Sequence, residues 1–260
     1  MTTATTDPRV FRPGARAWVA MVAAEARMVT RDTAGLVVPI ALPMLFLVMN
    51  GLGSSTEPLP GAGGMSVFDL YVLPLILVIG VATIGVVNMP SFLSYYRKSG
   101  VLRRLGVTPA SPVMILVAQL VVSVLQTALG VALAIAVAVL GFGAHLPNRP
   151  WLGLAVFALA AAAMYAVGLL VASIAPSPNA AVAIGLGSFF ALGAVGGMFG
   201  SPENLPDGVA RLGELLPFGA AVRALSATWL GEVPASTHVL ALVGTILVCG
   251  LLSARLFRWG

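Results

Sequence analysis

The residues best suited to chemistry in this chain form a basic island at positions 95–104. Guanidinium and ammonium groups bind carboxylates and phosphates, so the island offers ionic docking to an acidic partner or to phospholipid headgroups. No Asp, Glu, Lys or Arg occurs from residue 70 to 96 or from 105 to 148. A short charged island between two long apolar blocks is typical of a cytoplasmic loop between membrane-spanning helices. Its four charges are Arg97, Lys98, Arg103 and Arg104.

A second group of polar residues follows one helical face within residues 113–140. Its side chains recur at i, i+4, i+7 and i+8, which places them on one side of a helix. Such a stripe hydrogen-bonds to a neighbouring helix, or it lines a substrate cavity or an interface between protomers. Asn50 and Asn88 in other apolar blocks allow the same alternatives. The stripe consists of Gln119, Ser123, Gln126 and Thr127.

Patterns of catalytic or metal-binding residues are missing from the sequence. It holds no HExxH, GxSxG or GxxxxGK[ST] string, and Cys249 is its single cysteine. We therefore expect no metal site, no disulfide and no nucleotide hydrolysis on this chain. The predicted spans also hold no acid or base, which argues against ion-coupled secondary transport.

Composition identifies the class of protein that carries these groups. The chain is 59% hydrophobic and 9% charged, with a mean hydropathy of +1.01, whereas soluble chains average about 25% charged residues. An all-α polytopic membrane protein is predicted, with no role in nucleic-acid binding. Its six spans are expected at residues 35–53, 70–92, 113–140, 151–174, 179–199 and 237–257. Prolines 39, 43 and 74 should kink the first two spans. Membrane helices tolerate such kinks when neighbouring helices donate hydrogen bonds to the freed carbonyls.

Two further segments are predicted to be helical without spanning. Residues 15–31 place large apolar side chains opposite Arg16, Arg27 and Arg31, which predicts an interfacial helix with its apolar face in lipid. Glu25 lies within the apolar stripe, either paired inside the protein or in contact with a partner subunit. Residues 201–228 hold three prolines, which divide the segment into two short amphipathic or re-entrant helices. The segment is either a connecting loop of unknown role or a lid over the outer end of a transport path.

The distribution of positive charge predicts the orientation in the cell membrane. Eleven of the fourteen Lys and Arg residues lie in the N-terminal segment, the basic island or the C-terminal tail. The positive-inside rule places these segments, and therefore both termini, in the cytoplasm.

The order of these features resembles the permease subunits of ABC-2 type exporters, along nearly the whole chain. The resemblance rests on Arg31-Asp32 before a proline-bearing first span, on 102–105 (Leu-Arg-Arg-Leu) leading to Thr108-Pro109, and on the external 205–217 segment. The daunorubicin-type drug-resistance permeases look most similar. In the family the basic loop usually opens with acidic residues, and here Tyr95-Tyr96-Arg97-Lys98 replaces them.

The resemblance implies a single transmembrane export domain over residues 1–260. The spans are apolar with scattered Gln, Ser, Asn and Tyr, which suits an amphiphilic drug or lipid more than a sugar. Two permease chains, identical or different, would pair with two ATP-binding subunits that carry the ATP and Mg²⁺. These subunits would push on the 15–31 helix and on a coupling loop at residues 94–110. A stand-alone carrier or channel and a non-transporting scaffold are the alternatives. The implied coupling residues are Glu25, Arg31, Arg97, Lys98, Leu102, Arg103, Arg104, Leu105, Thr108 and Pro109, and the substrate-path candidates are Asn50, Asn88, Gln119, Ser123 and Gln126.

Overall fold

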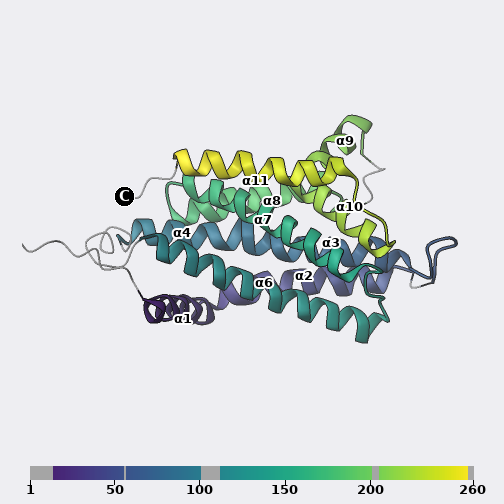
Figure 1. Ribbon diagram of the computed structural model, residues 1–260, viewed down its shortest axis with the longest axis horizontal. Coiled ribbons are helices and arrows are strands. Elements are labelled where there is room, and N and C mark those ends of the chain that lie inside the picture. The colour runs from purple at the N-terminus through teal and green to yellow at the C-terminus, as the bar shows by residue number, and fades with distance from the viewer. Residues whose placement is uncertain (1–13, 56, 101–111, 201–204, 257–260) are drawn as a thin grey trace, which may run out of the picture.

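Long helices running side by side make up this protein (Figure 1). The computed structural model describes residues 14–55, 57–100, 112–200 and 205–256. Within these ranges all the named elements are helices, and six of them are long and apolar enough to cross a membrane. The prediction of an all-α fold with six spanning helices is confirmed. They are α2 (Thr33–Gly53), the composite helix Phe68–Lys98, α6 (Pro112–Phe142), α7 (Pro150–Ile174), α8 (Pro178–Val195) and α11 (Ser236–Leu256).

The second spanning helix, Phe68–Lys98, forms the centre of the bundle. In its most apolar stretch 78% of the residues are buried, compared with 11% to 44% in the other five. Its sequence is apolar on all sides, which suits a helix surrounded by protein. The other spans expose large apolar side chains along their outer faces, as lipid-facing helices do.

This central helix is interrupted by two wider, π-helical stretches. They are η1 (Phe68–Val72) and η2 (Thr83–Asn88), and they precede the α-helical pieces α3 (Leu73–Ala82) and α4 (Met89–Lys98). Pro74 and Pro90 lie at the start of those pieces. A proline ring clashes with the carbonyl four residues earlier and donates no N–H, so the turns before it widen.

Glycines allow two neighbouring helices to pack directly on η2. A methyl group on Gly185 of α8 would lie 2.5 Å from the Val86 carbonyl oxygen, and one on Gly168 of α7 would overlap the Gly85 carbonyl. No larger residue fits at either position without displacing the central helix. The backbone of η2 is therefore in contact with the backbones of α7 and α8.

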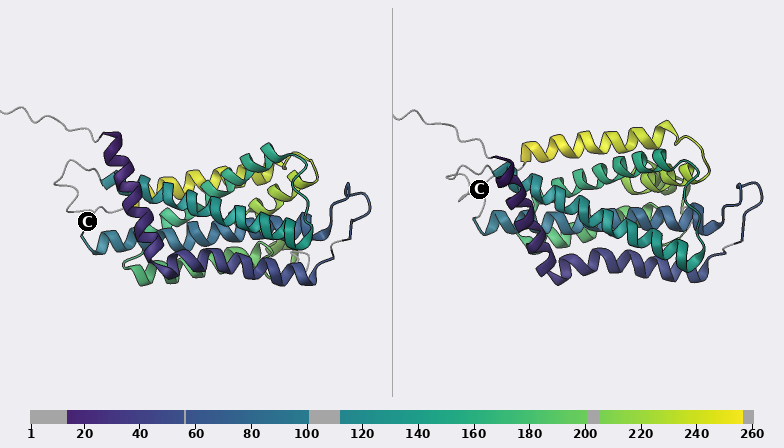
Figure 2. Two further views of the ribbon diagram at one scale, coloured as in Figure 1. Left: turned by 90° about the horizontal axis from the view of Figure 1, so that it is seen from below. Right: turned by 60° about the horizontal axis from the view of Figure 1, so that its bottom comes forward.

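Helix α1 (Ala15–Arg31) lies across one end of the bundle, where Figure 2 shows it crossing the other helices. A single residue, Asp32, joins it to α2. The Asp32 N–H donates to the Met28 carbonyl at 3.1 Å, and its carboxylate accepts from the Gly35 N–H at 3.1 Å. Asp32 therefore ends α1 and caps α2, and no flexible loop separates the two helices.

Part of the apolar face of α1 packs on the protein's own helices, and its position in the membrane interface stays a prediction. Helices α4 and α6 present an apolar surface at the same level. Val29 is 3% exposed and clusters with Phe92 and Tyr96 of α4 and with Ile115 and Val122 of α6.

The opposite end of the bundle is covered by α9 (Asp207–Leu215) and α10 (Pro217–Trp229). Helix α10 buries much of its surface against α7 and α11, whereas α9 is largely exposed. Arg223 of α10 and Glu214 of α9 form an ion pair at 3.1 Å. Gly196 at the end of α8 packs against Phe218 of α10. The absence of a side chain at Gly196 thus lets α8 and α10 approach each other closely within the same chain.

Candidate functional site

The last turn of α4 fastens α1 to the centre of the bundle. The Tyr96 hydroxyl donates to Glu25 Oε2 at 2.6 Å and lies 3.1 Å from the Met28 sulfur. Both partners of the first bond are buried, with 5% of Tyr96 and 4% of Glu25 exposed. A short hydrogen bond to a carboxylate is among the stronger polar contacts in proteins.

Burial governs the electrostatics of Glu25. Loss of water raises the pKa of its carboxyl above the ordinary value, and the Tyr96 hydroxyl acts in the opposite direction by stabilising the charged form. Of the two interpretations of Glu25, pairing within the protein matches this geometry. Its contact with a partner subunit stays a prediction.

Arg97, the next residue, binds a different helix. Its guanidinium donates to the Ala172 carbonyl at 3.3 Å and also to the Ala175 carbonyl, both at the end of α7. A cation placed on the last carbonyls of a helix satisfies them and complements the helix dipole. The structure thus gives Arg97 partners inside the chain, in addition to the role predicted for it in docking.

The remaining coupling residues divide into exposed and undescribed ones. Arg31 and Lys98 are exposed at the same end of the bundle. Together with Arg16, Arg27 and the small residues between them, Arg31 forms an exposed basic face on α1. Leu102, Arg103, Arg104, Leu105, Thr108 and Pro109 lie outside the described residues.

Two of the substrate-path candidates meet on a backbone carbonyl of α2. Pro39 donates no N–H, so the Gly35 carbonyl lacks its helical partner. The side-chain amides of Asn88 and Gln126 each donate to this carbonyl at 2.8 Å, and they also lie 3.3 Å from each other. The expectation that neighbouring helices satisfy a carbonyl freed by proline is confirmed here.

The rest of the polar stripe also faces protein. Gln119, Ser123 and Gln126 are at most 6% exposed. The Tyr165 hydroxyl of α7 lies 2.7 Å from the Thr127 hydroxyl and donates to the Ser123 carbonyl at 3.1 Å. Ser123, Gln126 and Thr127 therefore join α6 to its neighbours, which matches the first of the predicted alternatives, whereas the buried Gln119 Oε1 has no hydrogen-bond partner among the described residues. The sequence argument missed Tyr165, although a lone tyrosine in an alanine-rich span is a recognisable signal.

The cavities lie elsewhere than the predicted path. A void of about 10 Å³ between α2, α3 and α6 is lined by Thr127 among others, and it has room for no more than a water molecule. A groove of about 510 Å³ runs between α8 and α11 and is open to the side. None of the five path candidates lines this groove, and Asn50 donates to a carbonyl of its own helix at 2.8 Å. The groove is lined by Val167, Ser188, Ala191, Leu192, Leu216, Pro217, Gly244, Thr245, Val248 and Cys249.

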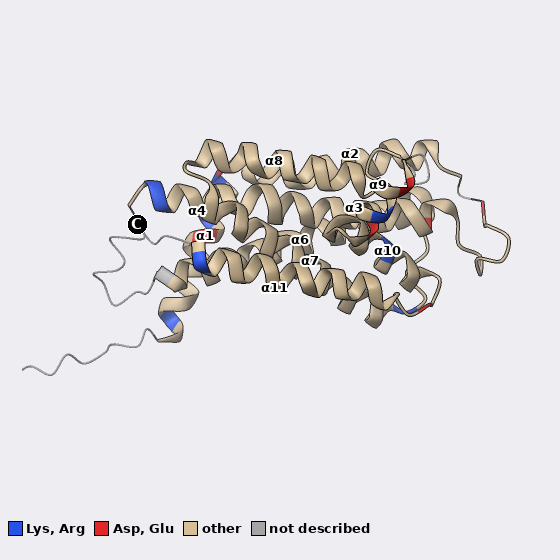
Figure 3. Ribbon diagram, turned by 90° about the horizontal axis from the view of Figure 1, so that it is seen from above, with Lys and Arg blue, Asp and Glu red and all other residues tan. Residues whose placement is uncertain are grey.

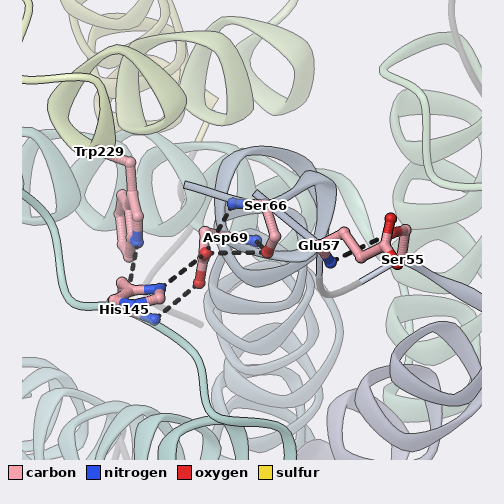
Figure 4. A network of polar contacts seen from close by, with 6 residues as sticks. All are labelled: Ser55, Glu57, Ser66, Asp69, His145 and Trp229. Carbon is pink, nitrogen blue, oxygen red and sulfur yellow. Dashed lines mark hydrogen bonds and ion pairs between the residues drawn. The ribbon is translucent and has the colours of Figure 1, made fainter. Parts of the chain in front are cut away.

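A network around a buried carboxylate holds the other end of the bundle (Figure 4). Asp69, 1% exposed, accepts from the Ser66 N–H at 2.9 Å and hydroxyl at 2.8 Å. It also accepts from the His145 N–H at 2.7 Å and lies 3.2 Å from His145 Nδ1. The Trp229 indole in turn donates to the His145 carbonyl at 2.9 Å. The carboxylate thereby joins the central helix, the connection between α6 and α7, and α10.

Asp69 corrects the expectation that the spans hold no acid. The predicted span began at residue 70, where the uncharged run begins, whereas the helix begins at Phe68. The Asp69 N–H donates back to the Ser66 hydroxyl at 3.2 Å, a reciprocal capping pair at a helix start. The spacing Ser-x-x-Asp before an apolar run carried this signal in the sequence.

Comparison with known proteins adds one match. The chain matches the family described as ABC-2 family transporter protein over residues 32–255. This segment runs from the residue after α1 to the last turn of α11. No curated protein matches the chain.

Proposed function

The chain belongs to the ABC-2 family of transporter proteins, and from that premise we propose that it exports an amphiphilic substrate. Family members are membrane permease subunits without catalytic activity of their own, and they pair with an ATP-binding subunit. In our proposal the ATP and Mg²⁺ bind to that separate cassette subunit. The whole chain, residues 1–260, acts as one transmembrane domain.

The observation that carries this proposal is an exposed basic face on elements joined directly to the first two spans. Arg16, Arg27 and Arg31 are exposed on α1, and α1 continues into α2 through Asp32 alone. Lys98 is exposed at the end of the central helix. A push on such elements reaches the membrane because no flexible loop intervenes.

We propose that this basic end faces the cytoplasm. Figure 3 shows Lys and Arg of α1 and α4 at one end of the bundle, and most of the Asp and Glu at the other. The first helix and the last turn of α11 lie at the same end (Figure 1). The positive-inside rule then puts both termini on the cytoplasmic side of the cell membrane.

The cassette subunit docks, in this proposal, on α1 and on residues 94–110. Arg31, Lys98, Arg103 and Arg104 would pair with its acids, whereas Leu102 and Leu105 would enter an apolar groove before Thr108-Pro109. Phospholipid headgroups compete for the same arginines. Arg97 would contribute less to docking, because its guanidinium already binds the carbonyls of α7.

The groove between α8 and α11 supports an amphiphilic substrate. Its lining is apolar apart from the hydroxyls of Ser188 and Thr245 and the thiol of Cys249. Ligand sites of comparable volume combine apolar walls with a few polar groups in this way. Drug export fits such a groove better than sugar export does. A second permease copy, as the family resemblance implies, would complete the transporter.

The proposal is tested with the variant Arg103→Glu/Arg104→Glu, co-purified with its ATP-binding partner and reconstituted in vesicles. Reversed charges repel an acidic docking surface, so we expect an inserted protein that no longer stimulates ATP hydrolysis or moves ethidium. Arg149→Glu/Arg211→Glu at the other end is the matched control and should retain both activities. Ethidium flux through the chain alone, without ATP, would instead show a carrier or channel. A scaffold would give no flux with or without the partner.

A further inference from the structure

Two consecutive residues at the end of the central helix hold two different helices. Tyr96 binds Glu25 of α1, and Arg97 binds carbonyls at the end of α7. Neighbouring positions on a helix point about 100° apart, so these bonds run in different directions. The last turn of α4 is thus the point where α1, the central helix and α7 are tied together.

The bond to α1 differs from the packing around it. Val29, Phe92, Ile115 and Val122 form an apolar cluster with the ring of Tyr96, and Glu25 is buried beside it. These contacts hold the ring of Tyr96 whether or not it carries a hydroxyl. The hydroxyl adds a directional bond to one atom of α1, in surroundings where a polar bond is strong.

We propose that the Tyr96–Glu25 hydrogen bond is the joint through which a displacement of α1 reaches the central helix. The inference rests on the proposed function, since it requires a partner that moves α1. Asp32 prevents α1 from sliding independently of α2, so a push on α1 tilts it about that residue. Tyr96 then passes the motion into α4.

The motion has a defined end point in the chain. Helix α4 is ten residues long, and the π-helical η2 lies directly before it in the central helix. Wider turns of this kind mark places where a helix bends. Asn88, the last residue of η2, is bonded to the Gly35 carbonyl of α2. A displacement at Tyr96 therefore reaches the hydrogen bond that links the central helix to α2.

The test compares two adjacent tyrosines in the transporter co-purified with its ATP-binding partner. Tyr96→Phe removes the bond and keeps the ring, whereas Tyr95→Phe alters a residue that is 54% exposed. We expect ethidium moved per ATP to fall about tenfold in Tyr96→Phe, the factor that one hydrogen bond to a charged group is worth. Tyr95→Phe should match the wild-type protein.

Deuterium exchange separates a joint from a structural contact. ATP with vanadate should change exchange in both α1 and residues 83–88 of the wild-type protein. In Tyr96→Phe the change in α1 should remain and the change in residues 83–88 should disappear. Glu25→Ala should behave like Tyr96→Phe, and Glu25→Gln, which keeps an oxygen that accepts from the hydroxyl, should restore part of the coupling.

The outcomes distinguish this inference from the proposed function. If trapping with ATP and vanadate changes nothing in the wild-type protein, the proposed function fails. If trapping changes exchange in the wild-type protein, and Tyr96→Phe and Glu25→Ala still transmit that change to residues 83–88, the joint is overturned. Glu25→Ala decides the question should Tyr96→Phe fail to fold.

Discussion

Each end of the molecule buries one carboxylate, and the two are held in different ways. Asp69 lies at the end covered by α10, which we propose faces outward and call the outer end, and it accepts hydrogen bonds from the backbone N–H and the side chain of both Ser66 and His145. Glu25 lies at the opposite end, which we call the inner end, and within the described part of the chain it accepts one, from the hydroxyl of Tyr96. Both side chains are nearly inaccessible, with 1% and 4% exposed. The difference lies in the number of donors rather than in burial.

From this difference we infer a fixed end and a movable one. At the outer end, one carboxylate joins the start of the central helix to the α6–α7 connection, and Trp229 adds α10. Movement there breaks several bonds at once. At the inner end, α1 joins α2 at Asp32, and among the described residues it is held to α4 by the Tyr96–Glu25 hydrogen bond, the Tyr96–Met28 contact and an apolar cluster. Under the proposed function force enters at the end that carries α1, and this asymmetry would leave that end free to move.

The largest effect is expected from Asp69→Ala, which tests the fixed end. The substitution leaves the donors of Ser66 and His145 unpaired at a buried position. The free energy of unfolding should fall by about 4 kcal/mol, since each orphaned buried donor costs about 1–3 kcal/mol. Denaturant unfolding in detergent micelles measures it. A loss under about 1 kcal/mol would show that the network does not hold the outer end.

His145→Gln is the matched control for that experiment. The His145 ring is 61% exposed, and the substitution keeps the backbone N–H that donates to Asp69. We expect a loss of about 0.5 kcal/mol, as for an exposed pair. A loss close to that of Asp69→Ala would mean that the imidazole, rather than the backbone, holds the carboxylate.

A smaller loss of stability is expected at the Gly35 carbonyl, which accepts hydrogen bonds from both Asn88 and Gln126. Asn88→Leu and Gln126→Leu each leave the Gly35 carbonyl with one amide donor, so each should cost about 0.6 kcal/mol, as typical bonds between membrane helices do. The double variant orphans the carbonyl and should cost roughly 2–3 kcal/mol, more than the sum. The same unfolding measurement gives the double-mutant cycle.

Asn50→Leu serves as the reference for this cycle. Its amide bonds to a carbonyl of its own helix, so its removal orphans no acceptor on another helix. Strict additivity of Asn88→Leu and Gln126→Leu would contradict shared use of the Gly35 carbonyl. The central position of these residues would then have to be explained by packing alone.

The fold was largely predictable because hydrophobic runs in a membrane protein are long and its charges are few. Six apolar blocks gave six spans, and Pro39 gave a freed carbonyl that neighbours satisfy. The polar stripe containing Gln126 was correctly read as one helical face, since periodicity is a local property. Its partners were not predictable, because Tyr165 lies 38 residues from Thr127.

The two carboxylates show where sequence reasoning stopped. Glu25 and Tyr96 are 71 residues apart, and Asp69 and His145 are 76 apart. Such pairs depend on how helices pack, which one sequence without relatives does not reveal. Asp69 was assigned to a loop because the uncharged run begins after it. The helix begins earlier because Ser66 and Asp69 cap it.

The smallest effect concerns the single bond at the movable end and depends on pH. Burial raises the pKa of Glu25 above its ordinary 4.5, so the folded state binds more protons than the unfolded state between the two pKa values. Stability is then fully present below pH 4.5 and is lost as pH rises through the raised pKa. Glu25→Gln removes this titration. The melting temperature of the variant minus that of the wild-type protein should therefore increase as pH rises. Glu57→Gln, the same substitution at an exposed acid, is the matched control. Parallel curves for Glu25→Gln itself would mean that Glu25 binds its proton equally in both states, and that its burial against Tyr96 does not affect its protonation.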